Sequence, residues 1–324
     1  MTSYRESGVD LDGSESHTRA ISGSVTSTWN ADVVGGFGGF AAGVRIREGY
    51  RDLVLMMSTD GVGTKLEIAR QVDRWDGIGH DLVAMCVDDL AAVGAMPIGF
   101  VDYLAVGALR PHRDRAIVES IARGCLEAGC PLLGGETAEH PGVMAPDAVD
   151  LAGSATGMLH ADEVLGPDRV RPGDAVIGLV SPNLRSNGFS LVRRVMGEEV
   201  EKHADALLEP SVIYSPAVMA ATATGGVHAA AHITGGGLDG NLARALPPGL
   251  AARVDRTSWA VPEVFGLIAS RGVRDDEMER VFNMGIGFCL VVDPGSVETV
   301  LDATAAHSPR VIGQVAPERG EGIG

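Results

Sequence analysis

Residues 77–95 read GIGHDLVAMCVDDLAAVGA, and this stretch decides how the N-terminal half of the chain folds. Its apolar residues recur at spacings of three and four, which predicts an amphipathic α-helix. The apolar stripe consists of Leu82, Val83, Cys86, Leu90 and Val93. Met96 and Pro97 follow, and we expect the helix to end there, because proline disfavours helical backbone in the residue before it.

Three carboxylates lie on this expected helix. Asp81 and Asp88 are seven residues apart, close to two helical turns, so they share a face. Asp89 lies about 100° away on the more apolar side, where a carboxylate is costly unless it is paired or binds a cation. We therefore interpret Asp89 as functional, with Mg²⁺ as a cation that suits hard oxygen ligands. The alternative for Asp81 and Asp88 is a solvated surface position, which we favour for Asp81.

The rest of the chain mixes strand-like and helix-like segments. Strands are expected at residues 53–59, 98–107, 131–142 (a short strand that gives way to a loop), 149–159, 175–180, at the end of 282–292, and near 311–315. Helices are expected over residues 111–129, from about residue 190, after the glycine turn at 232–242, and near 296–306. Such a mixture, with glycine turns at element ends, predicts two α/β or α+β domains.

The cluster of glycine, proline and charged residues at 160–174 indicates a domain boundary. We expect a polar arm at residues 1–34 that is extended or mobile, an N-terminal domain at 35–163 and a C-terminal domain at 164–324. The N-terminal domain begins with GGFGGF (residues 35–40), where glycines allow close backbone approach and phenylalanines can anchor the segment.

Composition excludes several classes of partner. The 324 residues are 45% apolar, which is enough for a substantial core. No apolar run approaches the roughly 18 residues that span a bilayer, and the polar N-terminus is unlike a signal peptide. The net charge of −17 argues against nucleic acid. The four cysteines lack a zinc-like spacing and predict reduced, mostly buried thiols of a cytoplasmic protein.

The segment STDGVGTK (residues 58–65) follows an expected strand and combines an acid, two glycines, a threonine and a lysine. It does not match the P-loop, which needs four residues between the first glycine and the Gly-Lys pair. Only Lys65 and Lys202 among the 26 basic residues are lysine, so Lys65 is notable there, although a chance surface lysine is the alternative. Together with Asp60, the loop predicts binding of phosphate and a cation.

Other glycine-rich segments could also bring backbone N–H groups to phosphate oxygens: GGFGG, LLGGET, RSNG and ITGGG. No Gly-x-Ser-x-Gly elbow occurs, and no cysteine lies in an evidently electropositive turn. Phosphoryl transfer by positioning and electrostatics needs no protein nucleophile.

Seven segments resemble, in the same order, motifs of the phosphoribosylformylglycinamidine cyclo-ligase (AIR synthetase) family. They are STDGVGTK, DLVAMCVDDLAAVGA, GGETAEHPG, RSNGFSLVR, HITGGG, SWAVPEVF and FNMGIG, and the likeness covers residues 4–315. The resemblance implies a homodimer of two-domain α+β subunits, in which N-terminal strands form a barrel across the dimer and both subunits contribute to the ATP site. It also implies that ATP phosphorylates the amide oxygen of formylglycinamidine ribonucleotide. A nitrogen then attacks, phosphate leaves, and the ring of aminoimidazole ribonucleotide closes in de novo purine biosynthesis.

The resemblance also implies roles for individual residues. Catalytic roles fall on Asp60, Lys65, Asp89 and His232, with Asp60 and Asp89 as ligands of Mg²⁺. ATP phosphates or nucleotide would contact Gly61, Gly63, Thr64, Lys65, Gly135, Glu136 and Thr137. The ribonucleotide would contact Arg185, Ser186, Asn187, Gly188, His232 and Thr234. The N-terminal arm and GGFGG would cover ATP.

Three positions depart from the family pattern. Arg185 stands where the family usually has the histidine of His-Ser-Asn-Gly, and a guanidinium cannot shuttle protons near neutral pH, although it can bind phosphate. Met96 stands where a glutamate is usual. EPSVIY (residues 209–214) lacks the arginine of Pro-Thr-Arg-Ile-Tyr.

Three alternatives share features with this interpretation. Selenophosphate synthetase has the superfamily fold but expects a reactive cysteine or selenocysteine near the N-terminus, and no cysteine precedes Cys86. Thiamine-phosphate kinase is not expected to carry RSNGFSLVR with SWAVPEVF. A diverged, non-catalytic nucleotide-binding paralogue is favoured by Arg185 and Met96.

Overall fold

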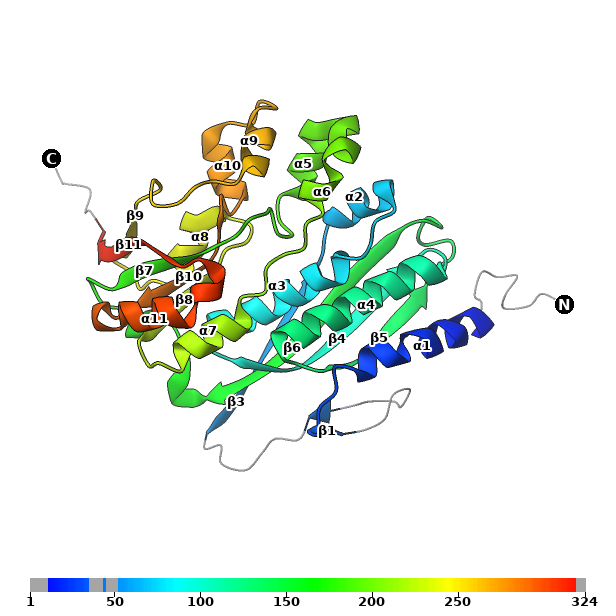
Figure 1. Ribbon diagram of the computed structural model, residues 1–324, viewed down its shortest axis with the longest axis horizontal. Coiled ribbons are helices and arrows are strands. Elements are labelled where there is room, and N and C mark those ends of the chain that lie inside the picture. Colours follow the sequence, from blue (N-terminus) through cyan, green and yellow to red (C-terminus); the bar gives the residue numbers. More distant parts are fainter. Residues whose placement is uncertain (1–10, 35–42, 45–51, 319–324) are drawn as a thin grey trace.

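The computed structural model describes residues 11–34, 43–44 and 52–318. Two sheets, each with its own helices, lie beside each other, and α3 (Ile78–Ala92) runs between them near the centre (Figure 1). The architecture is therefore α+β with two domains, as the sequence predicts. In the described residues, no helix is long and apolar enough to cross a membrane.

The N-terminal domain is built on a four-stranded sheet in the order β3-β6-β4-β5, in which only the β4–β5 pair is parallel. Its strands are β3 (Leu53–Gly61), β4 (Met96–Val106), β5 (Leu132–Glu139) and β6 (Val149–His160). Besides α3, its helices are α1 (Leu11–Thr26), α2 (Lys65–Val72) and α4 (Pro111–Ala128), and β1 (Val33–Val34) pairs with β2 (Gly43–Val44). The expected strands and helices of this half are thus present.

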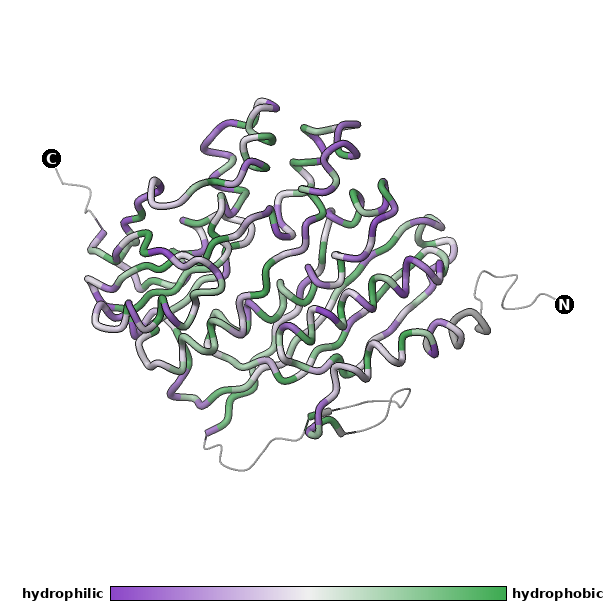
Figure 2. Tube along the Cα trace, in the orientation of Figure 1, coloured by the Kyte–Doolittle hydropathy of each residue, from purple (hydrophilic) through white to green (hydrophobic). Residues whose placement is uncertain are grey.

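One face of this sheet packs against helices and the other is open. Residues alternate between the two faces along β3, so that Val54 and Met56 join the core whereas Leu55 and Met57 are 53% and 75% exposed. On β4, the large side chains that solvent reaches are those of Met96, Val101 and Tyr103. The trace of β3 is hydrophobic along much of its length despite this exposure (Figure 2). The open face is therefore a broad apolar surface.

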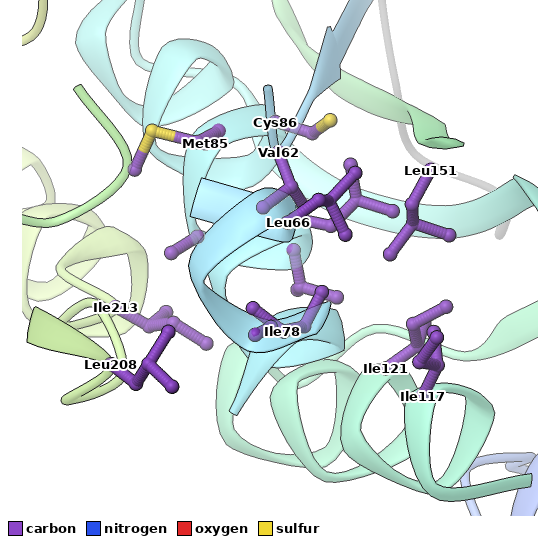
Figure 3. Close-up of a cluster of buried hydrophobic side chains, with 14 of the residues drawn as sticks. Val62, Leu66, Ile78, Met85, Cys86, Ile117, Ile121, Leu151, Leu208 and Ile213 are labelled. Atoms are coloured by element: carbon purple, nitrogen blue, oxygen red, sulfur yellow. The ribbon is translucent and has the colours of Figure 1, made fainter. Parts of the chain in front are cut away.

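Helix α3 is buried on almost every side, because it packs against the sheet, α4, α7 and the C-terminal domain. Gly79 lets α4 come close: a Cβ atom there would lie 2.3 Å from the backbone nitrogen of Ile121. Figure 3 shows core side chains around this helix, including Leu208 and Ile213 from the C-terminal half near Ile78. The largest hydrophobic core is therefore shared by the two domains.

The C-terminal domain contains an antiparallel sheet in the order β8-β10-β7-β11-β9. Its strands are β7 (Ala175–Val180), β8 (Val227–His232), β9 (Leu250–Val254), β10 (Ile286–Val292) and β11 (Arg310–Pro317). Its α-helices are α5 (Phe189–Met196), α6 (Ala204–Leu207), α7 (Ser215–Thr222), α8 (Gly237–Arg244), α9 (Glu263–Ala269), α10 (Asp275–Val281) and α11 (Val297–Ala303). Short 3₁₀ turns occur at Ala161–Glu163, Pro167–Arg169, Gly197–His203, Pro294–Ser296 and Ala305–His307. Helices α7 and α11 cover one face of the sheet and α8 covers the other.

Two expectations about local structure are wrong. Part of the supposed arm forms α1, which lies against α4, and Trp29 Nε1 donates a 2.7 Å hydrogen bond to the carbonyl of Leu132. The segment GGET is not a turn, because residues 134–137 lie inside β5. The segment GGFGGF lies outside the described residues.

Asp102 is a carboxylate on the helix-covered side of the sheet, in register with Gly153 of β6 and Gly135 of β5. No cation pairs with it in the described part of the chain, and burial raises its pKa to about 7. An unfolded aspartate has a pKa of about 3.9, so the folded chain binds this proton more tightly.

The sign of the resulting pH dependence follows from this shift. Stability from the Asp102 proton is fully present below about pH 4 and is lost as pH rises through about 7. We predict that Asp102→Asn flattens this decline by up to about 4 kcal/mol of unfolding free energy. Denaturant titrations of both proteins at several pH values measure it, and identical pH profiles would contradict the assignment.

Candidate functional site

An acid and an imidazole meet where the two domains face each other. Asp89 Oδ1 on α3 lies 2.8 Å from His232 Nδ1 at the end of β8, and Ser58 of β3 donates a 3.3 Å hydrogen bond to Asp89 Oδ2. An ionised carboxylate only accepts hydrogen bonds, so His232 Nδ1 carries a proton, and in the neutral imidazole Nε2 carries the lone pair. His232 is buried, and its Nε2 has no partner among the described residues.

The pair opens onto a cavity of about 380 Å³. Its polar end is lined by Ser58, Asp89, His232, Asn241 and Arg244, and its apolar end includes Met56, Val93 and Leu165. The lining comes from β3 and α3 on one side and from β8 and α8 on the other. The cavity therefore lies between the domains.

Asp60 lies at the end of β3, on the same sheet face as Ser58, and interacts electrostatically with Asp89 and His232. Burial raises the pKa of Asp60, and the negative charge of Asp89 adds to the effect although the N–H of Gly61 opposes it. Burial would also raise the pKa of Asp89, but His232, Ser58 and Arg244 together hold it below its ordinary value. Asp60 thus lies near enough to Asp89 for the charge of Asp89 to act on it.

Two carboxylates of this kind fit Mg²⁺ in the way that nucleotide enzymes hold it. No group of three or more His, Cys, Asp or Glu side chains in residues 11–34, 43–44 and 52–318 could form a protein-only metal cage. Mg²⁺ needs no such cage, because it keeps waters and substrate phosphates around one or two carboxylates. Asp60 and Asp89 therefore suit a cation that arrives with phosphates.

Lys65 does not lie at the surface of the glycine loop, where the sequence predicts that it contacts phosphate. Its side chain is fully buried, with Nζ 2.7 Å from Asp81 Oδ2. Nζ also donates hydrogen bonds to the carbonyls of Arg185 (3.2 Å) and Glu209 (3.0 Å). Burial lowers the pKa of Lys65, and the charge of Asp81 opposes that shift. Phosphate cannot reach this ammonium without rearrangement.

The expectation that Asp81 is solvated is also wrong. Its side chain is 0% exposed, and Oδ1 accepts hydrogen bonds from the backbone N–H of Ser211 (2.8 Å) and from its hydroxyl (2.6 Å). Asp88 is equally buried, and its Oδ1 accepts the backbone N–H groups of Tyr214 and Ser215, each at 2.9 Å. Another segment of the chain thus covers the face that these acids share.

Arg185 is buried and pairs with Asp88, whereas the sequence predicts that it contacts substrate. Its Nη2 lies 2.6 Å from Asp88 Oδ2, and the residue is 1% exposed. The guanidinium also donates to the carbonyls of Gly287 (2.9 Å) and Val212 (3.0 Å) and lies 4.9 Å from the ring centroid of Tyr214. Arg185 replaces the usual histidine of the family, and Val212 replaces the usual arginine. The hydrogen bond from Arg185 to the carbonyl of Val212 therefore joins two departures from the family pattern.

The two glycine loops lie next to each other. Thr64 Oγ1 is exposed and lies 3.0 Å from Ser190 Oγ at the start of α5. Asn187 and Gly188 line a second cavity of about 410 Å³, together with the glycine turn at residues 235–236 and part of α10. Ser186 Oγ and Asn187 Oδ1 are inaccessible to solvent and have no partner in the described part of the chain. Thr234 lies directly between His232 and this turn.

Gly135, Glu136 and Thr137 do not join Asp60 within one subunit. Asp60 pairs with β6, and β6 and β4 separate it from β5. Three strand spacings correspond to about 14 Å. Glu136 pairs with Tyr103 on the open face, whereas Asp60 faces the helices. The expectation that GGET neighbours Asp60 is therefore wrong within the subunit.

Sequence reasoning missed Ser58 and Arg244. The two-residue period of β3 places Ser58 on the same face as Asp60, so the strand pattern in the sequence could have identified Ser58. Arg244 lies at the end of α8, where no motif marks it, and it reaches the cavity only through the fold.

The family models that match this chain define its class. The model of the AIR synthase related N-terminal domain matches residues 38–159, and that of the C-terminal domain matches residues 171–324. The fold resembles that of thiamine-monophosphate kinase from Stenotrophomonas maltophilia, with a TM-score of 0.67, 20% identity, and coverage of 93% of this chain and 94% of that one. The hydrogenase maturation protein HypE in complex with ATP gives 0.65, 20% identity, and 94% and 85% coverage.

Sequence similarity to a curated enzyme is much higher. The phosphoribosylformylglycinamidine cyclo-ligase of Parasynechococcus marenigrum is 43% identical over 317 residues, which cover 94% of this chain and 92% of that protein. The chain belongs to the phosphoribosylformylglycinamidine cyclo-ligase family.

The buried pair predicts a large effect of Lys65 on stability. Lys65→Met leaves Asp81 buried without its cation, which lowers the unfolding free energy by about 3–5 kcal/mol. Lys202→Met is the matched control, because Lys202 is the other lysine and is exposed. Denaturant unfolding compares the two, and equal stability of both variants would refute the role of the pair.

Proposed function

We propose that this chain catalyses the ATP-dependent closure of formylglycinamidine ribonucleotide to aminoimidazole ribonucleotide, releasing ADP and phosphate. Membership of the cyclo-ligase family supports this reaction. The observation that carries the assignment to a site is the contact between Asp89 and His232 beside Asp60, in a cavity between the domains.

His232 acts as the base in this proposal. Asp89 accepts the hydrogen bond from Nδ1–H and so keeps the Nε2 lone pair directed away from α3. The nitrogen that closes the imidazole ring must lose a proton when it attacks the activated carbon. The unpartnered Nε2 would accept that proton, and Asp89 would then stabilise the imidazolium.

Asp60 and Asp89 would hold Mg²⁺, which neutralises phosphate charge during transfer. The exposed Thr64 and the backbone of Gly61 and Gly63 would bind phosphates at the end of β3. The ribonucleotide would lie against residues 186–188 and Thr234, since this loop holds polar atoms that lack partners. The terminal phosphoryl group of ATP and the amide oxygen that receives it would then meet between the two loops.

The open sheet face supports a homodimer. A contiguous apolar patch is unusual on a monomer, and packing of this sheet face against a second copy would cover the exposed side chains of β3 and β4. A closed barrel across two subunits would also enclose Glu136, which lies on this face. The four free, buried cysteines support a reducing compartment, so we place the protein in the cytoplasm.

The reaction is tested with pure protein, Mg²⁺, ATP and formylglycinamidine ribonucleotide, and the diazotisable amine of the product is measured. We predict turnover by the wild type and a loss of at least about 100-fold in kcat for His232→Gln and for Asp89→Asn. Asp302→Asn, an exposed acid on α11, is the control. Folded wild type that forms no product would favour the non-catalytic paralogue.

The dimer has its own test. Met57 is 75% exposed on the open face, so Met57→Glu places a charge inside the proposed interface. We predict a wild-type dimer by sedimentation and a Glu variant shifted to monomer, whereas Met57→Leu stays dimeric. A monomeric wild type, or a Glu variant as dimeric as the wild type, would rule out this interface.

A further inference from the structure

Arg185 adopts a backbone conformation that its residue type rarely takes. Its φ is 59°, in the left-handed region that favours glycine. Such a conformation persists only where the surroundings determine it, and it is often found beside ligand sites. In this structure, the contacts of the Arg185 side chain hold the backbone in that conformation.

The guanidinium of Arg185 is held from three elements. It pairs with Asp88 on α3, donates to the carbonyl of Gly287 on β10, and donates to the carbonyl of Val212 in the segment before α7. The ring of Tyr214 packs against its face. A planar fork with several donors satisfies these partners together, which a single ammonium cannot do. This side chain therefore fixes its own Cα relative to both domains.

The backbone of Arg185 is held as well. Its N–H donates a 3.0 Å hydrogen bond to Asn183 Oδ1, and its carbonyl accepts from Lys65 Nζ at 3.2 Å. Lys65 follows directly after the loop that begins at Asp60. The first residue of RSNG is therefore tied to the end of STDGVGTK.

The residues after Arg185 carry the polar groups that lack partners. Ser186 Oγ and Asn187 Oδ1 are inaccessible to solvent, and Asn187 lines the cavity of about 410 Å³. Gly188 is fixed on the far side, because a Cβ atom there would lie 2.2 Å from the ring of Phe282. Arg185 and Gly188, which pack against the interior, thus flank Ser186 and Asn187, whose side-chain oxygens have no partner in the described residues.

We propose that Arg185 is a positioning residue for residues 186–188, which we call the SNG loop. Through its ion pair with Asp88 it holds this loop in the conformation that binds the ribonucleotide, without touching the ligand itself. The identity of the ligand rests on the proposed function, whereas the ordering of the loop does not. Direct binding of substrate phosphate by Arg185 is inconsistent with its burial and with the protein partners of both Nη1 and Nη2.

The first measurement is amide hydrogen exchange of a peptide covering residues 183–191 in the ligand-free protein. Arg185→Met removes the guanidinium. Arg185→Gly also removes it but relaxes the backbone strain. We expect both variants to exchange at least about tenfold faster in this peptide, with strand β10 unchanged. Arg274→Met, an exposed arginine at the start of α10, is the control and should behave as the wild type.

The second measurement is steady-state kinetics of the same proteins. A positioning role predicts that the KM for the ribonucleotide rises by at least about tenfold in both variants, with a smaller change in the KM for ATP. Arg185→Lys keeps the charge but not the fork, and should give an intermediate value for exchange and for KM. If the Met variant fails to fold, the Lys variant tests the proposal in its place. Amide exchange of residues 183–191 at the wild-type rate in the Lys variant would overturn the proposal.

Arg185→Gly distinguishes the guanidinium from the backbone. Wild-type loop exchange in this variant would show that the left-handed backbone alone orders the loop, and would overturn the proposal. An inactive wild type would refute the proposed function but would leave the exchange result to decide the role of Arg185.

Discussion

The structure depends on the neutralisation of two buried carboxylates on one helix. Asp81 and Asp88 lie on the same face of α3, and moving a charge out of water costs several kcal/mol unless a partner compensates for it. Lys65 and Arg185 are those partners. Lys65 ends the glycine loop at residues 58–65, and Arg185 begins the one at residues 185–188. The ion pairs that compensate the buried carboxylates of α3 therefore also hold these two loops near each other. Removal of either cation would leave an uncompensated charge at the meeting point of the domains.

Asp89 shows how one residue along a helix changes the role of a carboxylate. Asp88 faces the C-terminal domain and has no solvent exposure, whereas the side chain of Asp89 is 48% exposed and turns to the cavity. His232 meets Asp89 from the other domain, and Asp60 lies close enough for the charge of Asp89 to raise its pKa. The helix thus separates acids that hold the fold from an acid that is free to bind a cation. This division is physical, because a carboxylate saturated by backbone N–H groups and a guanidinium has little capacity left for a metal ion.

Much of the fold followed from periodicity, and much of the site did not. The alternation of strands and helices was legible because each segment has its own apolar pattern. Helix α1 was missed, because its polar composition lacks a strong stripe and its stability comes from packing against α4. The direction of Lys65 depends on Asp81, and that of Arg185 depends on a residue 97 positions away, so neither could be found from local sequence. The motifs located the right loops, but they could not tell which side chains point into a ligand site and which point into the interior.

The shared core has a consequence for how this chain can evolve. The family matches divide the sequence near residue 165, yet Leu208, Ile213 and Phe265 from the second part lie in the same core as Val62 and Ile78 from the first. The division therefore does not separate two independent hydrophobic cores. If one half were exchanged for that of a relative, the apolar contacts and the ion pairs between the halves would both have to be restored. We therefore expect the two halves to be inherited as a matched pair.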